Sequence, residues 1–77
     1  MHVVIAKVDE IFFDGEAESL SVPGREGEMT ILGEHMPLVT TLKAGELVVR
    51  EKNGGEKKFP VAEGVLEVRH DGATVIL

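Results

Sequence analysis

Apolar and polar residues alternate along most of this chain with the two-residue period of a half-buried β-strand. Leu20 and Val22 are separated by a serine, and Leu66 and Val68 alternate with charged residues. Successive side chains of a strand point to opposite faces, so this period predicts strands with one buried and one wet face. The run 3–6 is apolar at every position, which predicts a central or covered strand. No long stretch keeps the apolar period of a helix.

Short dipeptides divide the chain between these strands. Asp14–Gly15, Asn53–Gly54 and Asp71–Gly72 are predicted hairpin turns, because Asn-Gly and Asp-Gly supply the positive φ angles that two-residue turns require. The turns are flanked by short apolar or alternating segments. This spacing predicts an all-β fold, a β-sandwich or barrel of about eight to ten short strands. The short length predicts a single domain over residues 1–77.

The run 22–45 holds the densest set of turn-forming residues. Gly24 and Gly27 bracket a tight turn, Gly33 ends the apolar segment 29–32, and Pro37 leads into segment 38–42. Glycine tolerates positive φ and proline fixes φ near −65°, so a loop built this way holds one shape. We expect a rigid docking edge, in which alternation sends one of the first two residues of 38–42 into the core.

The composition excludes several classes of function. The chain has a net charge of −6, with 14 acidic and 8 basic residues. Nucleic-acid binding depends on Lys and Arg that neutralise phosphates and on aromatic rings that stack on bases. An acidic chain without Tyr or Trp is therefore a poor nucleic-acid binder. The absence of cysteine from the sequence excludes disulfides and thiolate metal sites.

The size of the chain favours a partner. A domain of 77 residues buries only about 60% of its unfolded surface, so we expect marginal stability alone. No apolar run approaches the ~20 residues of a membrane span. The start, residues 1–6, lacks the basic leader and long apolar stretch of a signal peptide. We expect a cytosolic protein that meets a membrane only through a partner complex.

The candidate chemistry is sparse. His2, His35 and His70 lie far apart, with no second histidine or carboxylate at a recognised metal-ligand spacing. A general base needs a hydrogen-bonding partner and a pocket, and the sequence indicates neither. The chain contains no nucleophile elbow and no phosphate-binding loop. The residues alone therefore predict no catalytic, cofactor or metal site, and favour binding over turnover.

Motifs along the whole chain resemble one family. The central run contains, in order, Val22-Pro23-Gly24, Glu26-Gly27-Glu28, Ile31-Leu32, His35, Pro37-Leu38, Thr40, Leu42 and Gly45. This order resembles the hallmark stretch of the epsilon subunit of F-type rotary ATP synthases. Segments 13–16, 64–68 and 74–77 resemble three further motifs of that family. The resemblance implies a flattened β-sandwich with a non-catalytic role at the foot of the central stalk.

The resemblance also implies two partners, the gamma subunit and the c-ring. For gamma it implies His35, Met36 and Thr40 in the loop and strand that face the stalk, and Lys7 in the first strand. For the c-ring it implies Glu28, together with Glu26 in the same turn. The module would rotate with both partners and couple proton flow to ATP synthesis at the cytoplasmic face of the cell membrane. No cofactor is implied.

The chain departs from the family pattern at a few places. Gly33-Glu34 stands where the family commonly has Pro-Gly, and Met36 replaces a small residue. The family commonly adds a C-terminal helical hairpin, which this sequence lacks. Either the chain is a naturally short epsilon subunit or it is part of a longer one. If it is complete, we expect neither inhibition by such a hairpin nor an ATP site within it.

Two other classes of protein remain as alternatives. Lipoyl and biotinyl carrier domains are also small acidic β-modules, but their modified lysine lies in Met-Lys-Met or Asp-Lys-Ala. Lysines 7, 43, 52, 57 and 58 have other neighbours. A cupin-like metalloenzyme needs clustered histidines, and the histidines here are dispersed. Another small protein-binding β-module stays open on composition alone.

Overall fold

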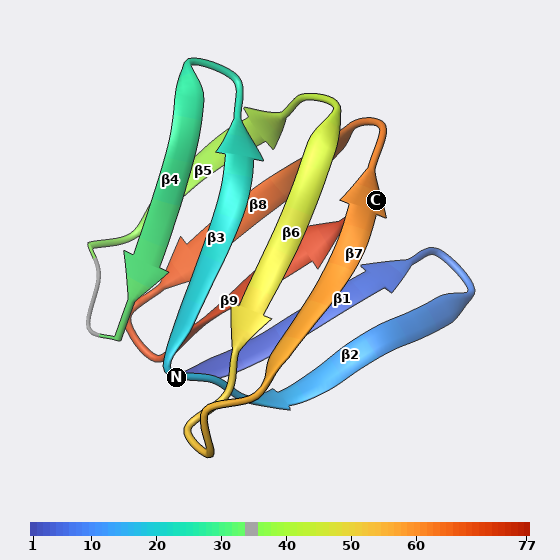
Figure 1. Ribbon diagram of the computed structural model, residues 1–77. Helices are drawn as coiled ribbons and strands as arrows, with labels where there is room; N and C mark the ends of the chain where they lie inside the picture. Colours follow the sequence, from blue (N-terminus) through green and yellow to red (C-terminus); the bar gives the residue numbers. More distant parts are fainter. Residues whose placement is uncertain (34–35) are drawn as a thin grey trace.

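The computed structural model describes residues 1–33 and 36–77. These residues form nine β-strands. In chain order the strands are β1 (His2–Lys7), β2 (Glu10–Glu16), β3 (Ser19–Gly24), β4 (Gly27–Leu32), β5 (Leu38–Leu42), β6 (Gly45–Arg50), β7 (Glu56–Val61), β8 (Gly64–Arg69) and β9 (Gly72–Ile76). No helix is assigned within the described ranges. The predicted all-β fold is confirmed (Figure 1).

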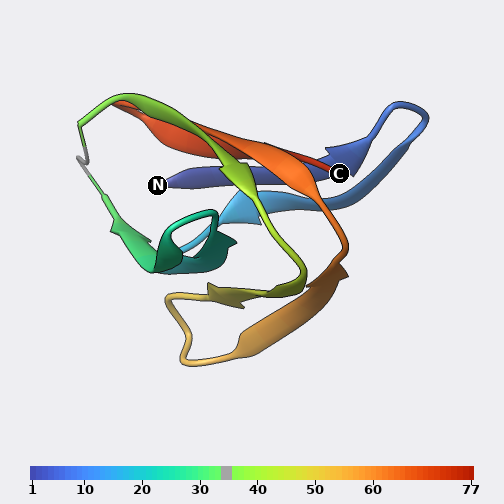
Figure 2. The same cartoon turned by 90° about the horizontal axis from the view of Figure 1, so that it is seen from above.

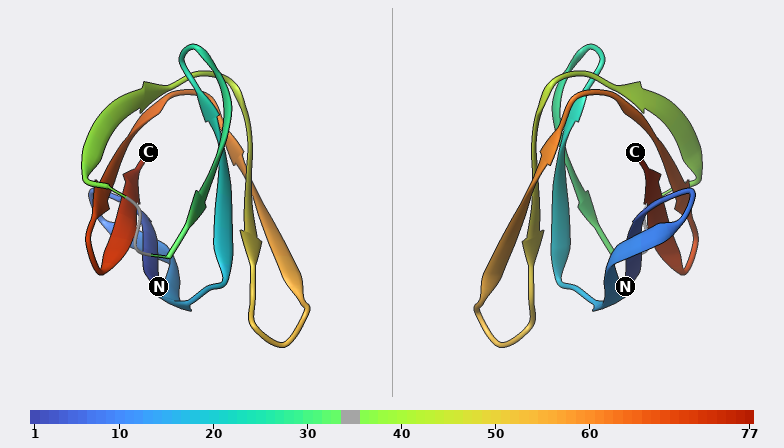
Figure 3. Two further views of the ribbon diagram at one scale, coloured as in Figure 1. Left: turned by 90° about the vertical axis from the view of Figure 1, so that its left-hand side faces the viewer. Right: turned by 90° about the vertical axis from the view of Figure 1, so that its right-hand side faces the viewer.

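The strands form two layers that are continuous at one corner. Hydrogen bonding runs in the order β2-β1-β9-β8-β5-β3-β6-β7, with β4 paired to β3. The step from β5 to β3 consists of one residue pair, Gly24 opposite Leu42. We call β2-β1-β9-β8-β5 the first layer and β4-β3-β6-β7 the second layer, which lie opposite each other (Figure 2). Figure 3 shows them close together at the end that carries the β3–β4 turn and spread apart at the other end.

The core lies between the layers and follows the predicted alternation. Leu20 and Val22 of β3 face Leu66 and Val68 of β8 across one apolar cluster, and all four are buried. The strand from the all-apolar run 3–6 lies between β2 and β9, as expected for a central strand. Alternation therefore indicates the core face correctly in both layers. Ser19 is an exception on the outer side of β3, because it is buried at 8% exposure.

The predicted turns agree with the structure to different degrees. The turn between Gly24 and Gly27 is confirmed, and Gly27 has a φ of 138°. Asn53–Gly54 also lies in a turn, where Gly54 has a φ of 92°. The last turn falls at residues 70–71, one position before the prediction, and Gly72 already begins β9. A Cβ on Gly72 would collide with the carbonyl oxygen of His2, so this glycine permits close strand contact.

The predicted turn at Asp14–Gly15 is wrong. Both residues lie inside β2, where they pair with Val4 and Val3 of β1. The reversal between the strands falls instead at Val8–Asp9. An Asp-Gly dipeptide expresses only a local preference, and the β1–β2 ladder, which buries Val3 and Ile5, overrides it.

Candidate functional site

An open groove lies beside the β3–β4 turn. Its volume is about 360 Å³ and its lining comes from the turn, β4 and β5. The lining residues are Arg25, Glu26, Gly27, Glu28, Met29, Leu38 and Thr40. The structure thus brings together Glu26, Glu28 and Thr40, which the sequence analysis assigned to two different partners. No ionisable group of the groove is buried.

Backbone contacts hold this turn against β5. The amide of Arg25 donates to the carbonyl of Thr41 at 3.1 Å, and the amide of Lys43 donates to the carbonyl of Pro23 at 3.0 Å. Packing within the β3–β4 turn is also close, because a Cβ on Gly24 would lie 2.7 Å from the Gly27 carbonyl oxygen. The turn is therefore tied to both layers where they meet, which supports the expected rigid edge.

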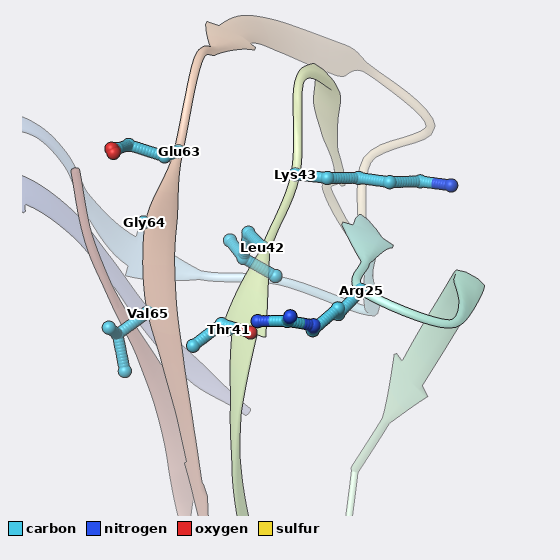
Figure 4. A pocket seen from close by; sticks show the side chains of 7 residues that line it. All are labelled: Arg25, Thr41, Leu42, Lys43, Glu63, Gly64 and Val65. Atoms are coloured by element: carbon cyan, nitrogen blue, oxygen red, sulfur yellow. The ribbon is translucent and has the colours of Figure 1, made fainter.

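A second hollow of about 570 Å³ lies on the other side of Arg25. It is lined by Arg25, Thr41, Leu42, Lys43, Glu63, Gly64 and Val65. Figure 4 shows the Arg25 side chain extending toward Thr41, while the Lys43 side chain points away from the hollow. Neither cation forms an ion pair within residues 1–33 and 36–77. The end of the molecule near the β3–β4 turn therefore presents charges of both signs to a partner.

The other predicted partner residues are spread over the first layer. Met36 lies just before β5 and is 78% exposed. Leu38 packs against the core and Val39 is 70% exposed, so the expectation that one of them enters the core is confirmed. Lys7 lies at the end of β1, its Nζ 5.9 Å from the centre of the Phe12 ring. Strands β8 and β9 separate it from β5. His35 lies outside the described residues.

The sequence analysis missed a charged cluster around His2. Its Nε2 lies 2.6 Å from Asp14 Oδ1 and its Nδ1 lies 3.2 Å from Glu16 Oε2. Hydrogen bonds to Glu16 and to Asp14 raise the pKa of His2 above its usual value. The terminal amine of Met1 lies 3.7 Å from Glu16. The carboxylates belong to β2, so the cluster depends on the β1–β2 register.

The described part of the chain was also searched for other kinds of site. Within it, no three His, Cys, Asp or Glu side chains gather as a metal site would require. In the same ranges, no helix has the length and apolar character needed to cross a membrane. The described residues thus form a small all-β domain with a charged, open groove.

The comparison with protein families identifies this domain. Residues 1–77 match the model of the ATP synthase delta/epsilon chain β-sandwich domain. The chain belongs to this family, and the resemblance found in the sequence is confirmed. The family and the names of its members agree with the prediction of a non-catalytic subunit.

Curated relatives cover nearly the whole chain. It is 40% identical over 76 residues to the ATP synthase epsilon chain of Alkalilimnicola ehrlichii, covering 99% of this chain and 54% of that one. It is 37% identical over 76 residues to the epsilon chain of Delftia acidovorans, covering 99% of this chain and 55% of that one. The chain thus spans about half the length of the curated relatives it matches.

Solved structures confirm the fold. A chain of the Euglena gracilis mitochondrial ATP synthase, solved as OSCP/F1/c-ring, matches with a TM-score of 0.89 at 22% identity, covering 96% of this chain and 48% of that one. A chain of the Tetrahymena thermophila mitochondrial ATP synthase central stalk and c-ring matches with a TM-score of 0.77 at 18% identity, covering 97% and 60%. At these identities the likeness concerns the fold alone.

Proposed function

We propose that this domain is a non-catalytic rotor part of a proton-translocating F-type ATP synthase. It binds the gamma subunit and rests on the c-ring, and it couples proton flow to ATP synthesis. The observation that carries the proposal is the match of residues 1–77 to the delta/epsilon β-sandwich family. In this role the domain is peripheral to the cytoplasmic face of the cell membrane, which it meets through the complex.

The β3–β4 turn supplies the contact with the c-ring. Glu26 and Glu28 are exposed, and the turn that carries them is tied to β5 by the Arg25–Thr41 hydrogen bond. A coupling element must transmit force without deforming, and a short turn fixed to both layers meets that need. Arg25 and Lys43 lie at the same end, so this surface offers both signs of charge to the polar loops of a ring.

The first layer supplies the contact with gamma. Met36, just before β5, and Val39 of β5 are exposed apolar residues, and Thr40 lines the neighbouring groove. His35 belongs to the same loop by sequence, and Lys7 lies at the end of β1. Interface centres are poor in charge and their rims are polar. Met36 and Val39 provide such a centre.

Reconstitution with the gamma subunit of the same organism tests this proposal. We expect an equimolar mixture to elute as one complex in size-exclusion chromatography at micromolar concentration. Thr40→Trp should weaken that complex while leaving the far-UV spectrum unchanged. Thr30→Trp is the matched control, because Thr30 is exposed on the second layer. Two separate species with the unsubstituted protein would contradict the proposal.

A further inference from the structure

The sequence contains a single side-chain amide. Asn53 is the only asparagine, and the sequence has no glutamine. Asn53 precedes Gly54 in the turn between β6 and β7, where both residues are exposed. This turn lies at the opposite end of the molecule from the β3–β4 turn (Figure 1). It is therefore separate from the groove and from the surface proposed for the c-ring.

Three hydrogen bonds shape the β6–β7 turn. The amide of Glu51 donates to the carbonyl of Gly55 at 2.8 Å, and the amide of Gly54 donates to the carbonyl of Glu51 at 3.0 Å. The amide of Gly55 donates to Asn53 Oδ1 at 2.8 Å. This last bond is the type by which asparagine side chains fold back on their own turn. It holds the side-chain amide of Asn53 against the peptide bond that follows it.

An asparagine in this position reacts with its own backbone. The nitrogen of the next residue bonds to the side-chain carbon while its proton passes to water, and the side-chain nitrogen leaves as ammonia. Water then opens the cyclic imide at either carbonyl, which gives aspartate or isoaspartate. A hydrogen-bond donor stabilises the oxygen on which negative charge collects during the attack. In this turn the Gly55 amide already donates to that oxygen, Asn53 Oδ1.

Little in the turn opposes closure of the ring. A side chain on the following residue would hinder the attack, and Gly54 has none. A Cβ built on Gly54 would meet no atom within 4 Å, so the peptide has room to rotate. Its φ of 92° is a conformation that glycine adopts without strain. Only the bond from the Gly54 amide to Glu51 must open first, and exposed hairpin bonds open at low cost.

The two Asp-Gly dipeptides of the chain provide an internal comparison. Asp14–Gly15 is held in β2 by pairing with β1. Gly72, which follows Asp71, begins β9 and packs so closely that a Cβ would collide with the carbonyl oxygen of His2. An ionised carboxylate is also a poorer electrophile than an amide. Of the three dipeptides, Asn53–Gly54 alone combines a reactive side chain with an open turn.

We propose that Asn53 is a site of spontaneous deamidation in the folded domain, with water as the other reactant. The product adds a negative charge to a chain whose net charge is already −6. Its isoaspartyl form also inserts a carbon into the backbone of the turn, next to the Arg50–Glu56 ion pair at 2.6 Å. The domain therefore acquires a more acidic form with a distorted β6–β7 hairpin as it ages. This inference does not depend on the proposed function.

The experiment ages the full chain at mildly basic pH and follows its intact mass and isoelectric point. Because Asn53 is the only side-chain amide, any conversion of an amide to an acid reports this residue. We expect the folded chain to convert at a rate within about tenfold of its rate in urea, since the turn opens easily. A slower reaction than this in the folded chain would mean that the turn protects Asn53, and would overturn the proposal.

Asn53→Gln is the matched control variant. Its longer side chain must close a larger ring, so its mass should stay constant under the same conditions. Labelling by an isoaspartyl methyltransferase measures the isoaspartyl product, and we expect the label on the aged unsubstituted protein and not on Asn53→Gln. An equal label on both proteins would assign the isoaspartate to the Asp-Gly dipeptides and overturn the proposal. Asn53→Asp should reproduce the isoelectric point of the aged protein from the start.

Discussion

The outer faces of the two layers differ although their inner faces are alike. On the second layer, Ser21 and Thr30 pair through their hydroxyls at 3.3 Å, and Arg50 meets Glu56 at 2.6 Å. On the first layer, the outward positions of β8, β9 and β2 include the exposed apolar residues Val65, Ile76 and Ile11. Both layers contribute to one buried core. Alternation therefore shows which side of a strand is buried within the domain, whereas the outward residues distinguish the two layers.

The β3–β4 turn and the outer face of the first layer also differ in the contacts that hold them in place. The β3–β4 turn depends on close backbone contacts that leave no room for a side chain at Gly24. The outer face of the first layer depends on the register of strands from both ends of the chain, since β1 pairs in parallel with β9. The charged turn is thus built from neighbouring residues, and the apolar side chains on the outer face of the first layer come from distant segments. The following substitutions test this contrast, from the largest expected effect to the smallest.

Two neighbours on β8 separate the inner face from the outer face. Leu66 is fully buried, so Leu66→Ala should lower the free energy of unfolding by about 2–5 kcal/mol through lost contacts and a residual cavity. Val65 is 41% exposed, so Val65→Ala should change it by less than about 0.5 kcal/mol. Urea denaturation of both variants measures this. Equal losses would mean that Val65 behaves as a core residue and not as an outer-face residue.

Two glycines test the turn assignments. A Cβ on Gly24 would lie 2.7 Å from the Gly27 carbonyl oxygen and 3.0 Å from Met29 Sδ. Gly24→Ala should therefore destabilise the domain by about 1–3 kcal/mol. At Gly15 a Cβ would make ordinary contact with Phe13 at 3.5 Å, and Gly15→Ala should be neutral or stabilising by up to about 1 kcal/mol. A large loss at Gly15, measured by thermal denaturation, would restore the hairpin turn that the sequence predicts there.

Glu28→Arg tests the charged turn apart from the apolar face. Exposed charge pairs contribute about 0.2–1 kcal/mol, so gamma affinity should change by less than about fivefold. Proton pumping per ATP hydrolysed, measured in membrane vesicles that carry the complex, should fall more clearly. Glu18→Arg is the control, because Glu18 is exposed between β2 and β3, at the opposite end. A loss of gamma binding that matches the loss of coupling would place Glu28 in the gamma interface.

The smallest effect concerns His2 on the first layer. Its pKa is raised by hydrogen bonds to Glu16 and Asp14. The stabilisation that the charged histidine provides is therefore full below the unfolded pKa of about 6.5, and is lost as the pH rises through the folded pKa. The melting temperature of the unsubstituted protein, relative to His2→Gln, should fall as the pH rises from below about 6.5 through the raised pKa of the folded protein. Parallel pH profiles of the two proteins would show that the cluster contributes nothing.

Much of the fold follows from local pattern. The strand 38–42 after Pro37, the turn between Gly24 and Gly27, and the buried faces of β3 and β8 all match their predictions. These features depend on the alternation period and on glycine and proline geometry, which neighbouring residues express by themselves. The failure at Asp14–Gly15 shows the limit. A local turn preference gave way to pairing with β1, a contact between separate segments.

The candidate surfaces likewise depend partly on local sequence and partly on tertiary structure. The sequence by itself determined the all-β class, the core-facing residues, the acidic charge and the family motifs. Only the tertiary structure decided that Glu26, Glu28 and Thr40 share a groove, that His2 meets Asp14 and Glu16, and that Val65, Ile76 and Ile11 form one row. The physical reason is that a period of two assigns each residue to a face, whereas register and strand order arise from packing between distant segments.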